Sequence, residues 1–288
     1  MGDVLAGIHA TWEFENDAVV IRFERGIRTP RLFQALRERR VPHEALASVT
    51  LAPGKRGTVV LHAVPRPGAD PLVEAAAGQL KDVCDPYRLV LPAEQETLAE
   101  YYRDELRRVL AGRPGGADGE PSDGFLVAAP EGPQSFKAYD GKATFDGRSE
   151  IAFRWFWTGA SSEKWKAGDQ TFAVRDLSGV EWRSPDVFDG YLRLLPRKGE
   201  PRPAQADQDP AAVVFGLGYG PVHESLPFAA SVLAAIRGAG RAAAPLAAER
   251  RDPAGVAERI RHLGELHRAG LVTDEEFTAK KADLLAEL

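Results

Sequence analysis

Hydrophobic residues along much of this chain alternate with polar ones, a pattern typical of strands with one buried face. Trp12 and Phe14 share one face of the first such segment, and Val19 and Ile21 share one face of the next. Between residues 92 and 111 the hydrophobic residues recur at helical spacing instead. The first part of the chain is therefore expected to form several antiparallel strands followed by one helix.

The same order of elements returns in the second half of the chain. Residues 41–65 align without a gap with residues 172–196, at an offset of 131, and their apolar positions largely coincide. Ile151 and Phe153 belong to a clear alternating strand, and a closing helix begins near Val222. A self-match of this kind indicates that one structural unit was built twice.

Segments without apolar periodicity divide the chain into parts. Residues 112–124 are rich in Gly, Pro and Asp, which predicts a linker between a first repeat at 4–111 and a second at 125–237. Residues 238–251 are mostly Ala, Arg and Gly, and we expect a second linker there. The alternative is that its alanines extend the preceding helix. The remainder, 252–288, is expected to form a helical hairpin.

The hairpin combines a helical stripe with a helix start signal. Thr273, followed by Glu276 three residues later, forms a capping box ahead of a second apolar segment. A unit this small buries little apolar surface alone, so we expect it to pack against a second copy or a protein partner. The residues expected at this contact are Ile260, Leu263, Phe277, Leu284 and Leu285.

Composition is that of a soluble globular protein, 44% hydrophobic and 27% charged. No apolar run approaches the roughly 20 residues that span a bilayer. The formal net charge of −5 argues against a general nucleic-acid binder. The single cysteine, Cys84, excludes an internal disulfide and agrees with a reducing compartment. We expect a cytoplasmic protein, with peripheral attachment to a membrane as the alternative.

The sequence lacks the spacings that catalysis or metal binding usually requires. Its six histidines are scattered, and neither HExxH nor GxSxG occurs. Residues 216–220, Gly-Leu-Gly-Tyr-Gly, superficially resemble a phosphate-binding loop, but they lack the GxGxxG spacing and no βαβ unit follows. Glycines required for a tight backbone are the preferred explanation. We therefore expect no enzyme activity, no cofactor and no metal.

The most suggestive polar segment is residues 22–40, which hold seven Arg against two Glu in a net acidic chain. Guanidinium groups suit phosphate or carboxylate through paired hydrogen bonds. We take the segment as a candidate site for an anionic ligand or a membrane surface. The alternative is a solvated loop or a face of internal ion pairs. The candidate ligand-binding residues are Arg25, Arg28, Arg31, Arg37, Arg39 and Arg40.

The corresponding segment of the second repeat is rich in tryptophan instead. Trp155 and Trp157 continue the alternation of Ile151 and Phe153, which predicts that both are buried in the core. Trp165 lies between two lysines and is less easily buried. It is our candidate for an exposed interface or membrane-surface residue, because Trp favours half-wet positions.

The tail resembles a known family. Residues 260–285 contain Ala-Gly-Leu-Val-Thr-Asp-Glu-Glu-Phe followed by Lys280 and Lys281, and closely resemble the SHOCT family, the short C-terminal domain of bacterial proteins. This resemblance implies an oligomerisation or interaction module without catalytic residues.

The rest of the chain is similar to the domain-of-unknown-function family DUF4429, through Phe-Glu-Arg-Gly-Ile-Arg-Thr-Pro at 23–30, Ala-Pro-Gly-Lys-Arg-Gly at 52–57 and Phe-Arg-Trp-Phe-Trp-Thr-Gly at 153–159. That family is often found in tandem before a SHOCT tail in actinobacterial proteins, and it has no established activity. It is similar to pleckstrin-homology-like domains, whose two near-orthogonal antiparallel sheets are closed by a C-terminal helix. In such domains the early strand-to-strand loop meets anionic ligands, and residues 22–40 occupy that place.

The resemblances imply an α+β, mainly β, fold: two tandem pleckstrin-homology-like barrels, each of antiparallel strands closed by a helix, plus the C-terminal hairpin. The function we expect is a non-enzymatic adaptor or scaffold that binds a protein partner or itself. Binding of an anionic ligand or membrane surface by the arginine-rich segment is the alternative, and no nucleic-acid partner is expected.

Overall fold

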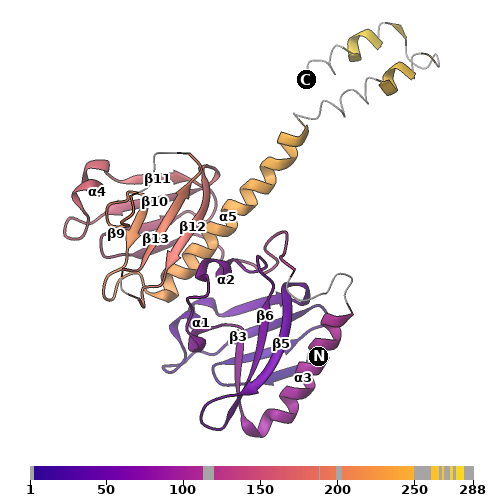
Figure 1. Cartoon of the computed structure of the whole chain (residues 1–288), viewed down its shortest axis with the longest axis vertical. Helices are drawn as coiled ribbons and strands as arrows, with labels where there is room; N and C mark the ends of the chain where they lie inside the picture. The colour runs from indigo at the N-terminus through magenta and orange to yellow at the C-terminus, as the bar shows by residue number, and fades with distance from the viewer. Residues whose placement is uncertain are drawn as a thin grey trace. The chain divides into compact units, whose positions relative to one another are not determined.

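The computed structural model divides the chain into two compact units, Met1–Arg237 and Gly238–Leu288. Both repeats lie in the first unit, and Figure 1 shows their strands and helices. The residues whose structure is described are 3–112, 120–187, 189–198, 203–249, 261–265, 268, 273–274 and 277–281.

The first repeat contains two antiparallel sheets, one of four strands and one of three. Ile21 in the middle of the first sheet pairs with Trp12 on one side and Arg39 on the other. The first sheet holds β1 (Asp3–Ala6), β2 (Ala10–Phe14), β3 (Ala18–Phe23) and β4 (Glu38–Pro42), and the second holds β5 (Leu46–Pro53), β6 (Thr58–Pro65) and β7 (Arg88–Pro92). The helices are α1 (Arg31–Leu36), α2 (Pro71–Ala76) and α3 (Glu96–Ala111), with short 3₁₀ helices η1 (His43–Ala45), η2 (Asp82–Cys84) and η3 (Ala93–Gln95).

The second repeat has the same two kinds of sheet. Its four-stranded sheet holds β8 (Gln134–Lys137), β9 (Gly141–Phe145), β10 (Glu150–Trp155) and β11 (Gln170–Ala173), and its three-stranded sheet holds β12 (Leu177–Arg183), β13 (Tyr191–Pro196) and β14 (Ala212–Val214). The helices are α4 (Ser162–Ala167), the 3₁₀ helix η4 (Val174–Asp176) and α5 (Val222–Glu249).

The order of elements confirms the duplication. α1 and α4 both follow the third strand of their repeat, and their bounds differ by the same 131 residues as the sequence match. The two copies also share a turn before their last strand. The carboxylate of Asp85 accepts a hydrogen bond from the N–H of Tyr87 (2.9 Å), and that of Asp209 accepts one from Ala211 (2.8 Å). Pro follows the Asp in both copies, which explains the recurrence of Asp-Pro in the sequence.

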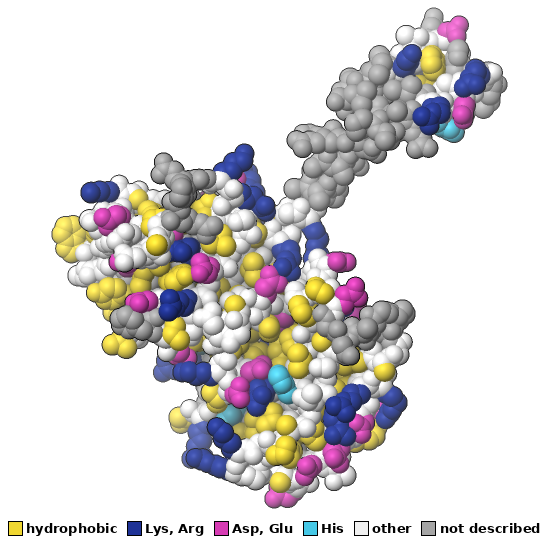
Figure 2. Space-filling model, in the orientation of Figure 1, with side chains coloured by type: hydrophobic (Ala, Val, Ile, Leu, Met, Phe, Trp, Pro, Cys, Tyr) yellow, Lys and Arg dark blue, Asp and Glu magenta, His cyan; other side chains and the backbone are white. Residues whose placement is uncertain are grey.

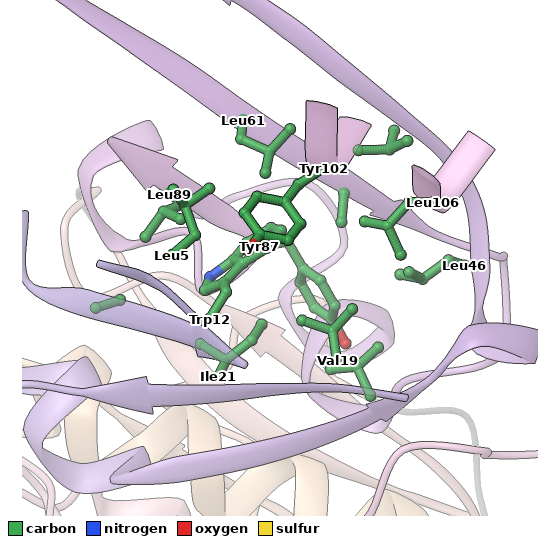
Figure 3. Close-up of a cluster of buried hydrophobic side chains, with 14 of the residues drawn as sticks. Leu5, Trp12, Val19, Ile21, Leu46, Leu61, Tyr87, Leu89, Tyr102 and Leu106 are labelled. Carbon is green, nitrogen blue, oxygen red and sulfur yellow. The ribbon is translucent and has the colours of Figure 1, made fainter. Parts of the chain in front are cut away.

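The core of the first repeat lies between its two sheets and α3, as Figure 3 shows. Trp12 and Ile21 point into it from β2 and β3, and Tyr102 and Leu106 reach it from α3. The ring of Phe14 stacks on Tyr102 at 4.2 Å between centroids, which fixes the helix against the first sheet. The residues that the alternation in the sequence placed on one face therefore form the buried face of this sheet.

Two expectations about architecture change. Each repeat has two separate sheets rather than a closed barrel. In the first repeat a bridge between Ile8 and Val90 links them, and no further strand pairing among the described residues closes the sheets. α5 continues over residues 238–249, so the alanine-rich segment extends the closing helix, the alternative that its helix propensity favours.

Candidate functional site

The arginine-rich segment is a structured connection rather than a simple loop. Residues 24–37, which we call the basic loop, join β3 to β4 and contain α1. Buried Phe33 stacks on Phe23 at 4.6 Å and anchors α1 to the sheet. The side-chain amide of Gln34 donates to the carbonyl oxygens of Gly26 (3.0 Å) and Thr29 (2.9 Å). These contacts fix the backbone that carries the arginines.

Three of the seven arginines are bound to carboxylates of their own repeat. Arg22 pairs with Glu13 and Glu38 on the sheet surface. Arg40 lies 2.9 Å from Glu15 and 2.8 Å from Asp17. The neighbouring strand residue, Arg39, is buried and binds Asp70, as described below.

Arg39 belongs to the interior of the repeat. Its guanidinium Nη2 donates to Oδ1 of Asp70 at 2.7 Å, and Oδ2 of the same carboxylate accepts from the Tyr87 hydroxyl at 2.7 Å. Oδ1 also accepts from the N–H of Leu72 and so caps α2. Burial, together with the charge of Asp70, raises the pKa of Tyr87 well above its ordinary value, so its hydroxyl remains a donor. We remove Arg39 and Arg40 from the candidate ligand site because Arg39 is buried against Asp70 and Arg40 is paired with two surface carboxylates.

The other four arginines are free of such pairing. Arg25, Arg28, Arg31 and Arg37 are exposed, and no described acidic side chain lies within ion-pair distance of any of them. Ile27 stands among them with its side chain fully exposed. Figure 2 shows Lys and Arg side chains gathered at the edge of the first repeat on the side of α1. The basic loop is thus a positive surface around an apolar tip.

A surface hollow of about 740 Å³ adjoins the basic loop. Arg31 of the loop and His223 at the start of α5 both line it. Burial lowers the pKa of His223 from its ordinary value, and the positive charge of Arg31 adds to this effect. The guanidinium group of Arg31 is therefore close enough to affect a titratable side chain that lines the hollow. The remaining lining residues are Gly26, Ile27, Thr29, Gln34 and Ala35.

The tryptophans of the second repeat divide into buried and exposed. Trp155 is buried at the end of β10, as predicted, and its indole N–H donates to the carbonyl of Gly168 at 2.8 Å. The prediction for Trp157 is wrong, since its side chain is 83% exposed. The strand ends at Trp155 and the chain then turns, with Gly159 donating to the carbonyl of Phe156. Alternation predicts burial only while the backbone stays extended.

Trp165 on α4 is 42% exposed, and its ring lies edge to face with that of Trp157 at 5.4 Å. Trp165 is therefore exposed as expected, and its role in binding stays a prediction.

The structure contains a buried ion pair near these rings that was not predicted from the sequence. Lys164 on α4 is fully buried and binds the carboxylate of Asp140, whose other oxygen accepts from the N–H of Val214 at 2.9 Å. Burial lowers the pKa of Lys164 and raises that of Asp140. Comparison of the two repeats could have indicated this position, because Lys164 aligns at the offset of 131 with Phe33, which is buried.

The glycine-rich segment before α5 has the tight geometry expected of it. Gly218 and Gly220 have φ values of 82° and 58°, which glycine adopts without strain. Gly216 lies against the ring of Tyr139, where a Cβ atom would come within 2.9 Å of that side chain. The glycines therefore serve the backbone path and the close contact.

Comparison with known families covers both repeats and the tail. Residues 12–107 and 143–233 match the family described as Domain of unknown function (DUF4429), together more than half of the chain. The chain belongs to the DUF4429 family. Residues 258–285 match the Short C-terminal domain, SHOCT. No curated protein matches the chain.

The DUF4429 segments begin within β2 and β9 and end within the closing helices α3 and α5, so the basic loop and Trp157 both lie inside the matched regions. Among the described residues, no group of three or more His, Cys, Asp or Glu side chains is arranged to hold a metal ion. None of the helices in the described part of the chain is long and apolar enough to cross a bilayer.

Within the SHOCT domain, residues 261–265 and 277–281 are helical. The N–H of Phe277 donates to the carbonyl of Thr273 at 2.9 Å, as expected for a helix that starts there. Leu263 and Phe277 are each partly exposed. The other expected contact residues, Ile260, Leu284 and Leu285, lie outside the described residues.

Proposed function

We propose that this DUF4429 protein is a non-enzymatic adaptor that binds an anionic membrane surface through its basic loop and associates through its SHOCT domain. The observation that carries the first part is the selective pairing of the arginines. Three of the seven are neutralised by carboxylates, whereas Arg25, Arg28, Arg31 and Arg37 remain exposed and without an acidic partner among the described residues. Charges left exposed on a fixed loop are available to a ligand.

The geometry favours the phosphates of lipid headgroups as that ligand. Guanidinium groups bind phosphate through paired hydrogen bonds, and basic residues near an acidic bilayer each contribute about 1 kcal/mol. Ile27 at the tip of the loop gives an apolar contact among the arginines. A basic loop with an apolar tip combines the two attractions of peripheral membrane binding.

The arrangement of sheets supports a pleckstrin-homology-like assignment for each repeat. A four-stranded and a three-stranded antiparallel sheet precede a closing helix in both copies. In that assignment the basic loop is an early connection between strands, where anionic ligands bind in domains of this type. The assignment belongs to the proposal and adds to the charge argument.

Neutralising the four arginines tests the proposal. Replacing Arg25, Arg28, Arg31 and Arg37 together with Gln is expected to weaken binding to vesicles containing about one third phosphatidylserine by roughly 10²–10³-fold. Wild-type binding should also fall as salt rises, because the Debye length shrinks from about 10 Å at 0.1 M to about 3 Å at 1 M. Vesicle sedimentation at several salt concentrations measures both effects.

A control variant keeps the same change in net charge but leaves the loop intact. Its four Arg→Gln substitutions lie on exposed positions of the second repeat: Arg148, Arg154, Arg175 and Arg183. This control should bind nearly as well as the wild type. Equal losses in both variants, or no binding of the wild type at 0.1 M salt, would show that the loop has no such role. Competition by inorganic phosphate in solution would instead assign the loop to a soluble anion.

The SHOCT part of the proposal rests on the two apolar side chains left partly exposed in a small helical unit, Leu263 and Phe277. Replacing both with Asp in the full chain is expected to convert an oligomer to a monomer, because charges oppose burial at an apolar contact. Light scattering gives the mass. The matched control places Asp at the exposed positions His262 and Ala279, and it should remain oligomeric. A wild-type protein that is already monomeric would contradict self-association.

A further inference from the structure

The second repeat exposes large apolar side chains at the end that carries α4. Trp157 and Leu217 are almost entirely exposed, whereas the tryptophans at positions 12, 155 and 182 are buried. Figure 2 shows hydrophobic side chains at the outer edge of this repeat. We call this group the aromatic surface, and its members are Tyr139, Trp157, Trp165, Leu217 and Tyr219.

The rings of the aromatic surface form two contacting pairs. Trp157 and Trp165 meet edge to face at 5.4 Å between ring centroids. Tyr139 and Tyr219 meet in the same manner at 6.4 Å. All four residues are more than two fifths exposed, so each contacts its partner ring while a large part of it stays open to solvent.

Backbone contacts join the two pairs into one surface. Phe156, which precedes Trp157, donates from its N–H to the carbonyl of Asp140 at 2.9 Å, and Asp140 follows Tyr139 in the chain. Gly216 packs directly on the ring of Tyr139. The segments at 139–140, 156–160 and 216–219 are therefore contiguous.

A rigid base lies beneath this surface. Lys164, next to Trp165 on α4, is buried and paired with Asp140, and its ammonium group lies 4.9 Å from the centroid of the Trp155 ring. This pair ties α4 to the turn between β8 and β9. Exposed rings on a fixed base bind without a large ordering cost.

We propose that the aromatic surface inserts into the interfacial region of a lipid bilayer. Trp and Tyr combine an apolar body with a polar tip and favour the boundary between hydrocarbon and water. On α4 the exposed charges of Glu163 and Lys166 balance, so the attraction is apolar rather than electrostatic. The choice of a bilayer rests on the proposed function of the basic loop, which is the corresponding connection of the first repeat. The exposed rings are an independent observation.

Intrinsic fluorescence tests the proposal in the wild-type chain. Because the other three tryptophans are buried, any change on adding vesicles reports chiefly on Trp157 and Trp165. We expect emission to shift to shorter wavelength and acrylamide quenching to fall, on vesicles of phosphatidylcholine alone and with phosphatidylserine. Both effects should persist at high salt once enough vesicles are present.

Replacing Trp157 and Trp165 with Ser should abolish the spectral change and weaken vesicle binding at least about tenfold, because large apolar side chains no longer leave water. Both side chains are exposed, so the circular dichroism spectrum should stay unchanged. The matched control replaces exposed Val83 and Tyr101 of the first repeat with Ser and should bind like the wild type.

The outcomes separate this proposal from that for the basic loop. Binding that depends on the arginines but leaves emission and quenching unchanged would overturn the aromatic surface alone. A spectral change on pure phosphatidylcholine without a salt-sensitive gain from phosphatidylserine would support the aromatic surface and reject the basic loop. Dimers that dissociate when both tryptophans are replaced, without any spectral response to vesicles, would assign the surface to a second copy and overturn the proposal.

Discussion

Replacing Asp70 with Asn is expected to lower the free energy of unfolding of the first repeat by about 3–5 kcal/mol. The carboxylate is fully buried and compensates the buried guanidinium of Arg39 at 2.7 Å. An amide carries no charge, and its NH2 group cannot accept the hydrogen bond that the oxygen it replaces accepted from Arg39 or Tyr87. The variant leaves a buried charge without compensation, one of the costliest single changes in a protein. Urea unfolding followed by far-ultraviolet circular dichroism measures the loss.

Two comparisons show whether the loss comes from the buried charge. Asp104→Asn removes an exposed carboxylate paired with Arg103 and should change the unfolding midpoint little. Adding Arg39→Met to Asp70→Asn removes the uncompensated charge and should restore much of the stability. A double variant as unstable as the single one would show instead that the hydrogen bonds to Leu72 and Tyr87 dominate.

The strands and the duplication could be predicted from the sequence because they depend on local periodicity. Val19 and Ile21 lie two residues apart on one face of an extended segment, and the fold buries both as that spacing predicts, although Val20 between them is buried as well. The pattern failed at Trp157, two residues beyond the end of β10, where the chain turns. The periodicity of hydrophobic residues does not predict where a strand ends.

The division of the arginines could not be predicted because it depends on contacts distant in the sequence. Arg39 meets Asp70 across 31 residues, and Arg40 meets Glu15 across 25. A local count of charges treats these arginines like Arg28, although only Arg28 has no carboxylate partner among the described residues. The ion pairs seen in the structure therefore reduce the candidate ligand-binding residues to Arg25, Arg28, Arg31 and Arg37.

Replacing Asp140 with Asn is expected to destabilise the second repeat by about 3–5 kcal/mol at pH 7, and this loss should shrink at higher pH. The ammonium group of Lys164 is buried beside Asp140, and the ring of Trp155 gives only weaker compensation. Without the carboxylate, the pKa of Lys164 falls further below its ordinary value. The folded variant then releases a proton that the unfolded chain keeps up to about pH 10.4.

The pH dependence of stability distinguishes the two buried pairs, because it is expected for Asp140→Asn and not for Asp70→Asn. Between the lowered pKa of Lys164 and its ordinary value, the unfolded state binds more protons, so stability of Asp140→Asn rises with pH by up to about 1.4 kcal/mol per unit. Arg39 keeps its charge throughout this range, so the loss in Asp70→Asn should stay constant from about pH 7 to 9.5. Urea unfolding at several pH values measures both. Parallel behaviour of the two variants would contradict a charged Lys164 as the cause. Lys164→Met combined with Asp140→Asn should remove the pH dependence, because no titrating group then remains at this position.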